Sequence, residues 1–391
     1  MGVSVIKSVE IYSPEYLGKK DILLIDDKIS RISNAINIDS LKQIFPDVDI
    51  FDAQNMICLP GIVDMHVHFN GAGGECSPQF RTPPLQLTDL TKAGITTAIG
   101  LLGTDGITRS LRDLYMKARA LENEGMSTWI FTGSYQIPSP TITENISLDI
   151  CMLEKVVGLK IAYSDHRSSN IGAKALIETL SASRVGGIVG GKSGKVMVHF
   201  GTPTTGLKKI KEIIEMTEIP LSQIIPTHLN RSQGLFNEAV LFGLAGGNVD
   251  LSAGISEKYH FRGAVKPSKA VAILIDKGVP VEQITMSSDG NGSMGVPKSD
   301  GSIQMLISPV KAMWEEFCDM VQQEGVNISD AISVVSTNPA NTLNLPRKGK
   351  IKEDFDADLL LVSRNFKLHT VIAKGQKMVV NGDTIVKGVF E

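Results

Sequence analysis

Several features are scarce in this chain of 391 residues, and each scarcity narrows its possible function. It has only four cysteines, Cys58, Cys76, Cys151 and Cys318, and none of them forms a CxxC pair. A disulfide framework or a cysteine zinc site is therefore not expected, and free thiols in a reducing compartment are. No apolar run approaches the about 20 residues that a membrane-spanning helix needs. The first residues also lack the apolar segment of a secretory signal. We therefore expect a cytoplasmic protein without a membrane partner.

An excess of charge of one sign is also missing. The 39 lysines and arginines nearly balance the 42 aspartates and glutamates, and the formal net charge is −3. A protein that binds nucleic acid usually carries a basic patch, so we expect no nucleic-acid partner. The hydrophobic fraction of 42% is ordinary for a globular protein, and the length suits one large domain plus a smaller one.

Both ends of the chain are rich in predicted strands. Short apolar or alternating runs occupy 3–11, 22–25 and 28–32 near the start, and 357–362 and 378–386 near the end. The last of these contains the dipeptide Asn381-Gly382, which is typical of a tight hairpin turn. We predict one small β-sandwich domain built from residues 1–58 and 346–391.

The middle of the chain, residues 59–345, alternates buried strands with amphipathic helices. Predicted strands lie at 96–102, 128–132, 159–162, 196–200, 224–227 and 284–287, and predicted helices lie at 110–124, 206–217 and 268–277. This alternation indicates an α/β fold with a parallel sheet. At this length a (β/α)8 TIM-type barrel is favoured over an open doubly wound sheet.

Four of the seven histidines lie at or just after predicted barrel strands. His66 and His68 are two residues apart, so on a strand both imidazoles point to one face. Alone, such a pair is more often two polar core histidines. However, His199, His228 and Asp289 also end apolar runs, at the strand ends where barrel active sites are built. Histidine and carboxylate ligands suit zinc or a similar divalent ion.

Lys160 lies inside the apolar stretch 156–162. A lysine in such a position usually extends its ammonium from an edge into solvent. If the side chain is buried, burial lowers the pKa of the amine. A neutral amine can add CO₂ and become a carbamate, which is an anionic group able to bind two metal ions.

Residues 60–68, followed in order by Lys160, His199, His228 and Asp289, resemble the metal-binding pattern of the amidohydrolase superfamily. The likeness is closest to the branch that hydrolyses β-aspartyl (isoaspartyl) dipeptides. It covers nearly the whole chain and includes the stretches 73–75, 100–105, 164–167, 184–187, 226–231 and 287–293.

The resemblance implies two zinc ions per chain, held by four histidines, a carboxylated lysine and an aspartate: His66, His68, Lys160, His199, His228 and Asp289. His66, His68 and Asp289 would bind one ion, His199 and His228 the other, and carboxylated Lys160 both. A bridging hydroxide would attack the scissile amide. Asp289 would take its proton and pass it to the leaving amine, and Tyr135 would stabilise the oxyanion.

The implied substrate is a small molecule, a β-aspartyl dipeptide, contacted by eight residues: Gly73, Gly74, Glu75, Thr104, Tyr135, Arg167, Arg231 and Ser293. Glu75 would accept the free α-amine, and the two arginines would bind the carboxylates, for which a planar guanidinium is well shaped. The resemblance also implies a homo-oligomer built from dimers, up to an octamer.

Three alternatives remain open at this point. Residues 186–193 match the P-loop pattern of a nucleotide hydrolase, but a predicted helix precedes them and a strand follows, the reverse of the required order. A cyclic-amide hydrolase, such as a dihydroorotase or hydantoinase, would share the fold and the metal site. A binding protein without activity on the same scaffold would have little reason to keep every ligand.

Overall fold

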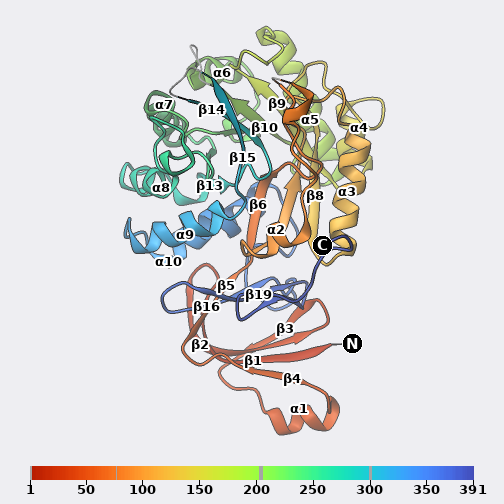
Figure 1. Cartoon of the computed structure of the whole chain (residues 1–391), viewed down its shortest axis with the longest axis vertical. Coiled ribbons are helices and arrows are strands. Elements are labelled where there is room, and N and C mark those ends of the chain that lie inside the picture. The colour runs from red at the N-terminus through yellow and green to blue at the C-terminus, as the bar shows by residue number, and fades with distance from the viewer. Residues whose placement is uncertain (1, 76, 202–205, 299–301) are drawn as a thin grey trace.

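The computed structural model describes residues 2–75, 77–201, 206–298 and 302–391, so Cys76 lies outside the described residues. The chain folds into a ring of strands surrounded by helices and a separate strand-rich sheet below it (Figure 1). Both labelled chain ends lie near that sheet, which agrees with the prediction that the two ends fold together. The described cysteines, Cys58, Cys151 and Cys318, carry free thiols.

The lower sheet contains nine strands from both ends of the chain: β1 (Val3–Tyr12), β2 (Tyr16–Ile25), β3 (Lys28–Ser33), β4 (Asp49–Asp52), β5 (Met56–Pro60), β16 (Leu359–Ser363), β17 (Leu368–Ala373), β18 (Gln376–Val380) and β19 (Asp383–Thr384). Their order is β19-β18-β17-β16-β5-β1-β2-β3, and β4 also pairs with β1. The antiparallel pairing of β5 with β16 joins the two ends. A strand-rich unit from both ends is thus confirmed, while its boundaries at residues 58 and 346 stay a prediction.

The hairpin predicted around Asn381-Gly382 forms between β18 and β19. Both turn residues have positive φ angles, 55° at Asn381 and 83° at Gly382. A two-residue hairpin turn of this kind requires left-handed backbone at both positions, and asparagine and glycine adopt it at the lowest cost.

Eight parallel strands form the barrel: β6 (Ile62–Val67), β7 (Ile95–Gly100), β8 (Ser127–Gly133), β9 (Val156–Tyr163), β10 (Lys195–Phe200), β11 (Ile224–Thr227), β12 (Val249–Ser252) and β13 (Ile284–Ser287). Strands β6 to β11 pair in chain order, and β12 pairs with β13. The ring closes through backbone hydrogen bonds beyond the strand ends. Leu229 N donates to Asp250 O (3.3 Å), and His68 N donates to Gly290 O (2.9 Å). The predicted α/β barrel is therefore confirmed.

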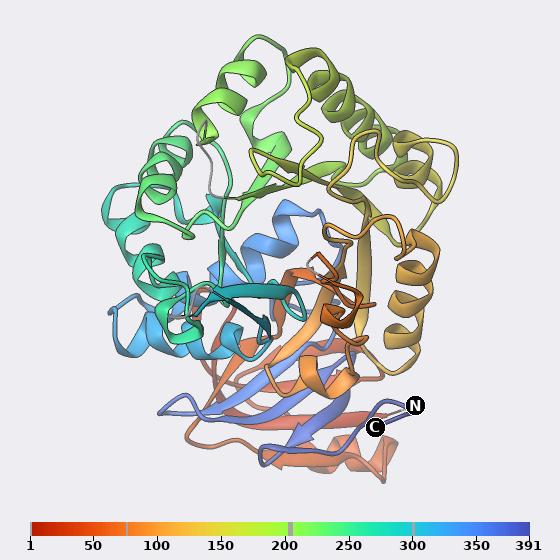
Figure 2. The ribbon, with the colours of Figure 1, turned by 45° about the horizontal axis from the view of Figure 1, so that its top comes forward.

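Helices pack around the outside of this ring (Figure 2): α2 (Leu87–Thr91), α3 (Leu111–Asn123), α4 (Ile146–Met152), α5 (Ala173–Gly190), α6 (Gly206–Glu215), α7 (Gln233–Leu244), α8 (Pro267–Asp276), α9 (Ala312–Gln322) and α10 (Ile328–Ile332). Helix α11 (Asn338–Thr342) instead packs against the barrel interior, where Ala340 joins the same buried cluster as Met65 and Met197. Helix α3 is typical, because Leu111, Leu114, Ala118 and Leu121 are buried on one face and Ser110 caps its start. None of the described helices has both the length and the apolar character required to cross a bilayer.

The residues that match the P-loop pattern, 186–193, begin within the last part of helix α5. Residues 186–190 form the last turns of α5, and Gly191 ends the helix in a left-handed conformation. A phosphate-binding loop must instead follow a strand and leave its backbone N–H groups free. The nucleotide-hydrolase alternative is therefore wrong.

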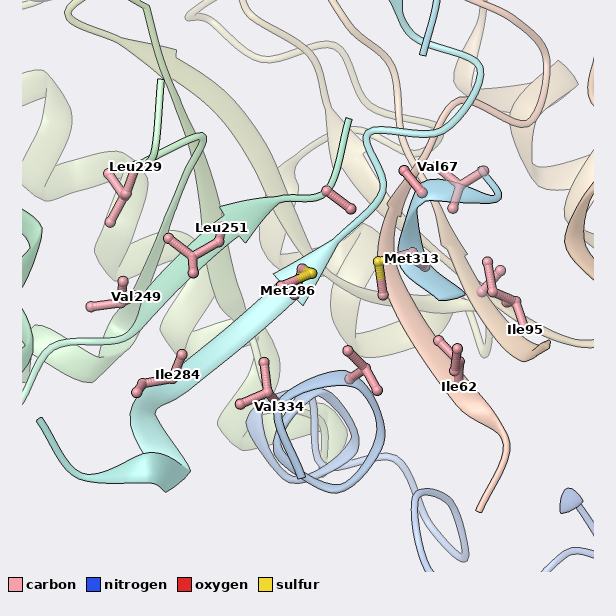
Figure 3. Close-up of a cluster of buried hydrophobic side chains, with 14 of the residues drawn as sticks. Ile62, Val67, Ile95, Leu229, Val249, Leu251, Ile284, Met286, Met313 and Val334 are labelled. Atoms are coloured by element: carbon pink, nitrogen blue, oxygen red, sulfur yellow. The ribbon is translucent and has the colours of Figure 1, made fainter. Parts of the chain in front are cut away.

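Apolar side chains fill the barrel at the end that faces the lower sheet. Met65 and Met197 belong to a buried cluster that Leu343 and Leu345, which follow α11, close from below. Figure 3 shows a second part of the core, where Ile62 of β6 and Met286 of β13 pack near Met313 of α9 and Val334. Val334 lies in a short π-helix, Ser333–Thr337. The barrel interior is thus apolar at this end. In barrels of this kind the active site is built at the opposite end, from the carboxyl ends of the strands and their loops.

One element at that opposite end was not predicted. Strands β14 (Ser293–Pro297) and β15 (Ile303–Ile307) pair antiparallel and form a hairpin after β13. The hairpin begins only a few residues after Asp289, so it lies beside the polar strand ends.

Candidate metal and substrate site

The four histidines and Asp289 converge at the carboxyl ends of the barrel strands. The ring centroids of His66 and His68 are 5.5 Å apart, those of His66 and His228 are 5.1 Å apart, and those of His199 and His228 are 4.6 Å apart. The Asp289 Oδ1 atom lies 3.2 Å from Nε2 of His66 and 3.2 Å from Nε2 of His68. The structure thus brings together all five residues that the histidine pattern singled out.

Two of these residues lie on strained backbone. His228 has a φ angle of 66° and Asp289 has a φ angle of 53°, which is the left-handed region that most side chains avoid. Each residue comes directly after a barrel strand, β11 or β13. Left-handed backbone costs about 1–2 kcal/mol per residue. Such strain is kept where the surrounding structure fixes a side chain for function. Here the left-handed backbone turns the side chains of His228 and Asp289 toward the other ligands at the centre of the barrel.

Lys160 lies in the middle of β9 and is completely buried. Its Nζ atom has no hydrogen-bond partner among the described residues. Burial lowers the pKa of this amine to about 7, although the carboxylates of Asp289 and Asp250 act in the opposite direction. The alternative of an edge lysine that extends into solvent is therefore wrong. A neutral amine in this position is suited to carbamate formation.

The imidazoles are also held in the neutral form. Burial keeps the pKa of His66, His199 and His228 well below the usual histidine range, because the charged ring would lose its hydration. A neutral imidazole offers a free lone pair, which is the form that binds a metal ion.

These residues fit a zinc site. Ligand atoms of His66, His228 and Asp289 all lie within 4.8 Å of one another. Nitrogen and carboxylate donors of this kind are those that zinc prefers. The unpaired Nζ of Lys160 is a buried polar atom that the protein alone does not satisfy. The structure therefore supports metal binding by this cluster, while the number and identity of the ions stay a prediction.

Tyr135 follows β8 and lies against the histidines. Its side chain is buried, and its hydroxyl lies 2.6 Å from Nδ1 of His199. Burial raises the pKa of the phenol above its usual value, so the hydroxyl keeps its proton and can donate a hydrogen bond. The alternative of an exposed loop tyrosine is therefore wrong.

A cavity of about 310 Å³ opens above the histidine cluster. Its polar lining includes most of the expected substrate contacts: Glu75, Thr104, Tyr135, Arg167, Arg231 and Ser293. Arg167 Nη1 lies 3.2 Å from Glu75 Oε1 and 3.3 Å from Thr104 Oγ1. Ser293 Oγ donates to Glu75 Oε2 at 3.2 Å. Arg231 Nε is buried and has no hydrogen-bond partner in the part of the chain that the structure describes.

Gly73 and Gly74 lie beside this cavity but do not line it. Both have positive φ angles, 83° and 94°, and form the turn that leads to Glu75. A side chain at Gly73 would collide with the carbonyl oxygen of Phe80, because a Cβ atom there would lie 2.2 Å from it. These glycines are needed for the course of the backbone, and a direct substrate contact by them stays a prediction.

Sequence reasoning missed the carboxylates behind the ligands. Asp250 accepts hydrogen bonds from Thr227 Oγ1 (2.7 Å), Thr285 Oγ1 (2.8 Å) and Ser287 Oγ (2.7 Å), and Thr227 Oγ1 also lies 3.5 Å from His66 Nδ1. Asp165 accepts from the guanidinium of Arg167 and lies 3.0 Å from His199 Nε2. A carboxylate within the short apolar run of β12 was the available signal for Asp250.

The cavity also has an apolar wall that the sequence did not predict. Phe261 lines one part of it, and Met294, Ile303 and Met305 from the β14–β15 hairpin line another. The hairpin residues and the histidines are far apart in the chain, so only the fold brings them together.

Comparison with known proteins places this geometry in a family. Residues 57–378 match the amidohydrolase family. Two crystal structures of β-aspartyl dipeptidase from Fervidobacterium islandicum AW-1, one of them with β-Asp-Leu bound, are 36% and 37% identical. They superimpose with TM-scores of 0.88 and 0.87, and each alignment covers 98% of both chains.

More distant relatives share the fold. The structure of a D-hydantoinase is 16% identical, with a TM-score of 0.70 and coverage of 99% of this chain and 97% of that one. A dihydroorotase from Clostridium acetobutylicum is 29% identical over 122 residues, which are 30% of this chain and only 27% of the relative. The family match spans most of the sequence, including the strands that carry the histidines, Lys160 and Asp289. The chain therefore belongs to the amidohydrolase family.

Proposed function

We propose that this amidohydrolase is a zinc-dependent dipeptidase that hydrolyses β-aspartyl (isoaspartyl) dipeptides. The observation that carries the proposal is the charge pattern of one cavity. The carboxylate of Glu75 and the guanidinium groups of Arg167 and Arg231 line the same space that opens onto Asp289. An isoaspartyl dipeptide has one free α-amine and two carboxylates around its amide, so it offers one positive and two negative groups to this arrangement. The likeness to the Fervidobacterium islandicum dipeptidase supports the same substrate class.

The zinc ions would be held by His66, His68, His199, His228 and Asp289, with Lys160 as a carbamate shared between them. When bound, two such ions lower the pKa of water and polarise a carbonyl group. Carbamate formation consumes CO₂ and the neutral amine and releases one proton. The low pKa of Lys160 supports this step, because it leaves the amine largely neutral above about pH 7.

Several side chains would act on the substrate directly. Asp289, whose oxygen lies between His66 and His68, would accept a proton from the attacking water and deliver it to the leaving amine. Tyr135 would donate its hydroxyl hydrogen to the oxygen that becomes negative during attack. The guanidinium of Arg231 lacks a partner at Nε, so a substrate carboxylate would satisfy a buried donor there.

The experiment that tests this function is a hydrolysis panel with the full-length protein, zinc and bicarbonate. β-Asp-Leu should be cleaved, whereas α-Asp-Leu, dihydroorotate and hydantoin should be poor substrates. Release of leucine from β-Asp-Leu measures the reaction. Faster turnover of dihydroorotate or hydantoin than of β-Asp-Leu would overturn the proposal.

A cyclic-amide hydrolase is the second candidate, and the local likeness to a dihydroorotase favours it. Dihydroorotate carries one carboxylate and no free amine. It would leave Glu75 without a cationic substrate group and would need only one of the two arginines. The cavity charge therefore favours the dipeptide.

A further inference from the structure

Asp165 contacts both halves of the proposed site, the histidine cluster through His199 and the substrate cavity through Arg167. It lies in the loop after β9, and its side chain is 3% exposed. Its Oδ1 atom accepts from Arg167 N (2.8 Å) and Arg167 Nε (2.9 Å). Its Oδ2 atom accepts from Arg167 Nη2 (2.9 Å) and lies 3.0 Å from His199 Nε2. The carboxylate is also packed closely against the backbone, because a Cβ atom at Gly201 would lie 2.4 Å from Oδ2.

The contact with His199 determines which ring nitrogen carries the proton. A carboxylate accepts hydrogen bonds, so the hydrogen of the neutral ring is on Nε2, toward Asp165. The lone pair of Nδ1 is then free, and it accepts from the hydroxyl of Tyr135 at 2.6 Å. This is the tautomer in which Nδ1 can bind a metal ion. A carboxylate behind a metal-binding histidine generally raises the basicity of the ring and fixes its orientation.

The contact with Arg167 determines which edge of the guanidinium reaches the cavity. Asp165 occupies the edge formed by Nε and Nη2, the edge that otherwise binds a carboxylate with two parallel hydrogen bonds. Only Nη1 remains, and it faces Glu75 and Thr104 in the cavity. Arg167 Nη2 also lies 3.3 Å from His199 Nε2, so without Asp165 the guanidinium would face the histidine with Glu75 as its remaining carboxylate partner.

We infer that Asp165 is a positioning residue that holds the metal-binding histidine and the substrate-binding arginine in register with each other. The inference rests on the proposed function and goes further, because it couples zinc binding to substrate binding through one side chain. The effects of Asp165 on zinc affinity and on substrate affinity can be tested separately. Asp165 supports zinc affinity through His199, and it supports substrate affinity through Arg167.

The test compares Asp165→Asn with a matched variant, Asp356→Asn. Asp356 is also a largely buried carboxylate paired with an arginine, because its Oδ1 atom lies 3.2 Å from Arg347 Nε. Asp356 belongs to the segment that leads into β16 and does not line the cavity. Zinc affinity is measured by competition with a chelator, without substrate, and KM and kcat are measured with β-Asp-Leu. Asp165→Asn should weaken zinc binding about ten- to hundred-fold and raise KM. Asp356→Asn should lower the melting temperature and leave both quantities unchanged.

A second comparison separates the two claims. In an Arg167→Ala background, Asp165→Asn should still weaken zinc binding but should raise KM little further, because the arginine through which it acts is gone. Unchanged zinc affinity and KM in a folded Asp165→Asn protein would overturn the inference. So would fully additive effects of Asp165→Asn and Arg167→Ala on KM. If Asp165→Asn does not fold, Asp165→Ser replaces it, because the smaller side chain leaves room for water.

These outcomes differ from a failure of the proposed function. A wild-type protein that binds zinc but does not cleave β-Asp-Leu would reject the proposed substrate. The zinc titration of the variants would still test the link between Asp165 and His199.

Discussion

A buried amine without a hydrogen-bond partner distinguishes Lys160 from the other buried lysines that the structure describes. Lys155, Lys160 and Lys348 are all largely buried. Lys155 donates to Glu122 and to a backbone carbonyl, and Lys348 donates to Asp358 at 2.6 Å. Lys160 has no such acceptor among the described residues. An unpaired buried amine is costly, so its retention indicates that another group completes it in the working protein.

The first prediction follows from that difference. Lys160→Ala should abolish hydrolysis of β-Asp-Leu and weaken zinc retention, because the variant cannot form the proposed carbamate ligand. A short carboxylic acid such as acetate or propionate should restore part of the turnover by occupying the vacated space. Zinc content after dialysis and the rate with added acid are the measurements.

Lys155→Ala provides the matched control, since it also removes a buried lysine close to β9. That variant should lose stability and keep its zinc. Near-normal activity of Lys160→Ala would show that Lys160 is not a ligand.

The second prediction concerns the substrate's amine. Glu75→Gln keeps the shape of the side chain and removes its charge. Loss of a charge-assisted hydrogen bond of about 1.5–3 kcal/mol should lower kcat/KM for β-Asp-Leu roughly ten- to hundred-fold. Because Glu75 also pairs with Arg167 at 3.2 Å, KM should rise more than kcat falls.

An N-acetylated β-aspartyl dipeptide serves as the comparison substrate. It has no ammonium group, so the wild type should cleave it slowly and the variant should lose little more. Zinc content should stay the same. An equal loss with both substrates would mean that Glu75 does not recognise the amine.

At the scale of secondary-structure elements, the barrel strands were predictable and the site hairpin was not. Strands such as β9 and β10 consist mainly of apolar residues because both of their faces are buried, and this gives a clear sequence signal. Strand β12 has only four residues, and Asp250 interrupts it, so its signal is weak. The β14–β15 hairpin contains glycine and proline and has largely exposed residues in β15, which reads as a loop.

The same reasoning explains which site residues could be predicted. His66, His68, His199, His228 and Asp289 each end an apolar run, so their shared position was visible in the sequence. Met294 and Met305 carry no chemical signal, and their place in the cavity depends on how the hairpin packs. Asp165 differs again, because Arg167 lies in the same loop but His199 lies in another strand, and only the folded structure brings both to one carboxylate.

The third prediction belongs to the hairpin. Its apolar side chains should contact the side chain of the leaving residue, so Met305→Ala should lower kcat/KM for β-Asp-Leu more than for β-Asp-Gly. Loss of contact with one or two methylene groups, at about 0.8 kcal/mol each, corresponds to roughly a four- to fifteen-fold change in the ratio. Ile307→Ala is the control, because Ile307 belongs to the same hairpin, is 52% exposed and does not line the cavity. Equal loss for both dipeptides would place the leaving residue elsewhere.

At the scale of the whole molecule, the groups that destabilise the folded state lie at one end of the barrel. Apolar packing at the other end stabilises the fold. The apolar plug of Leu343 and Leu345 and the sheet that joins β5 to β16 close the end away from the site. The described site instead contains neutral histidines, a lysine without a partner and left-handed backbone at His228 and Asp289. Stability is thus supplied where no chemistry occurs, and bound metal should add stability by favouring the folded state.

Removal of the metal should therefore expose a defined dependence of stability on pH. In the metal-free folded protein the pKa of His66, His199 and His228 is lowered by burial, so below about pH 6.5 the unfolded chain binds more protons than the folded chain. Lys160 acts in the same sense between pH 7 and 10.5, because burial lowers its pKa from 10.5 to about 7. Asp64, Asp250 and Glu316 act in the opposite sense at acidic pH, because burial raises the pKa of each of these carboxyl groups, that of Asp64 to about 7, and they offset the three histidines there.

The free energy of unfolding of the chelator-treated protein should consequently increase with pH between about 7.5 and 8.5, where the contribution of Lys160 dominates. Thermal melting of the metal-free protein across this range measures the effect. Lys160→Met should remove this increase, because the buried thiols of Cys58 and Cys318, whose pKa burial raises, act in the opposite sense as the pH approaches 9. The same pH dependence of the melting temperature in the metal-free wild type and in Lys160→Met between pH 7.5 and 8.5 would show that the Lys160 amine is charged in the folded state. That result would remove the physical basis for carbamate formation at this position, since only the neutral amine reacts with CO₂.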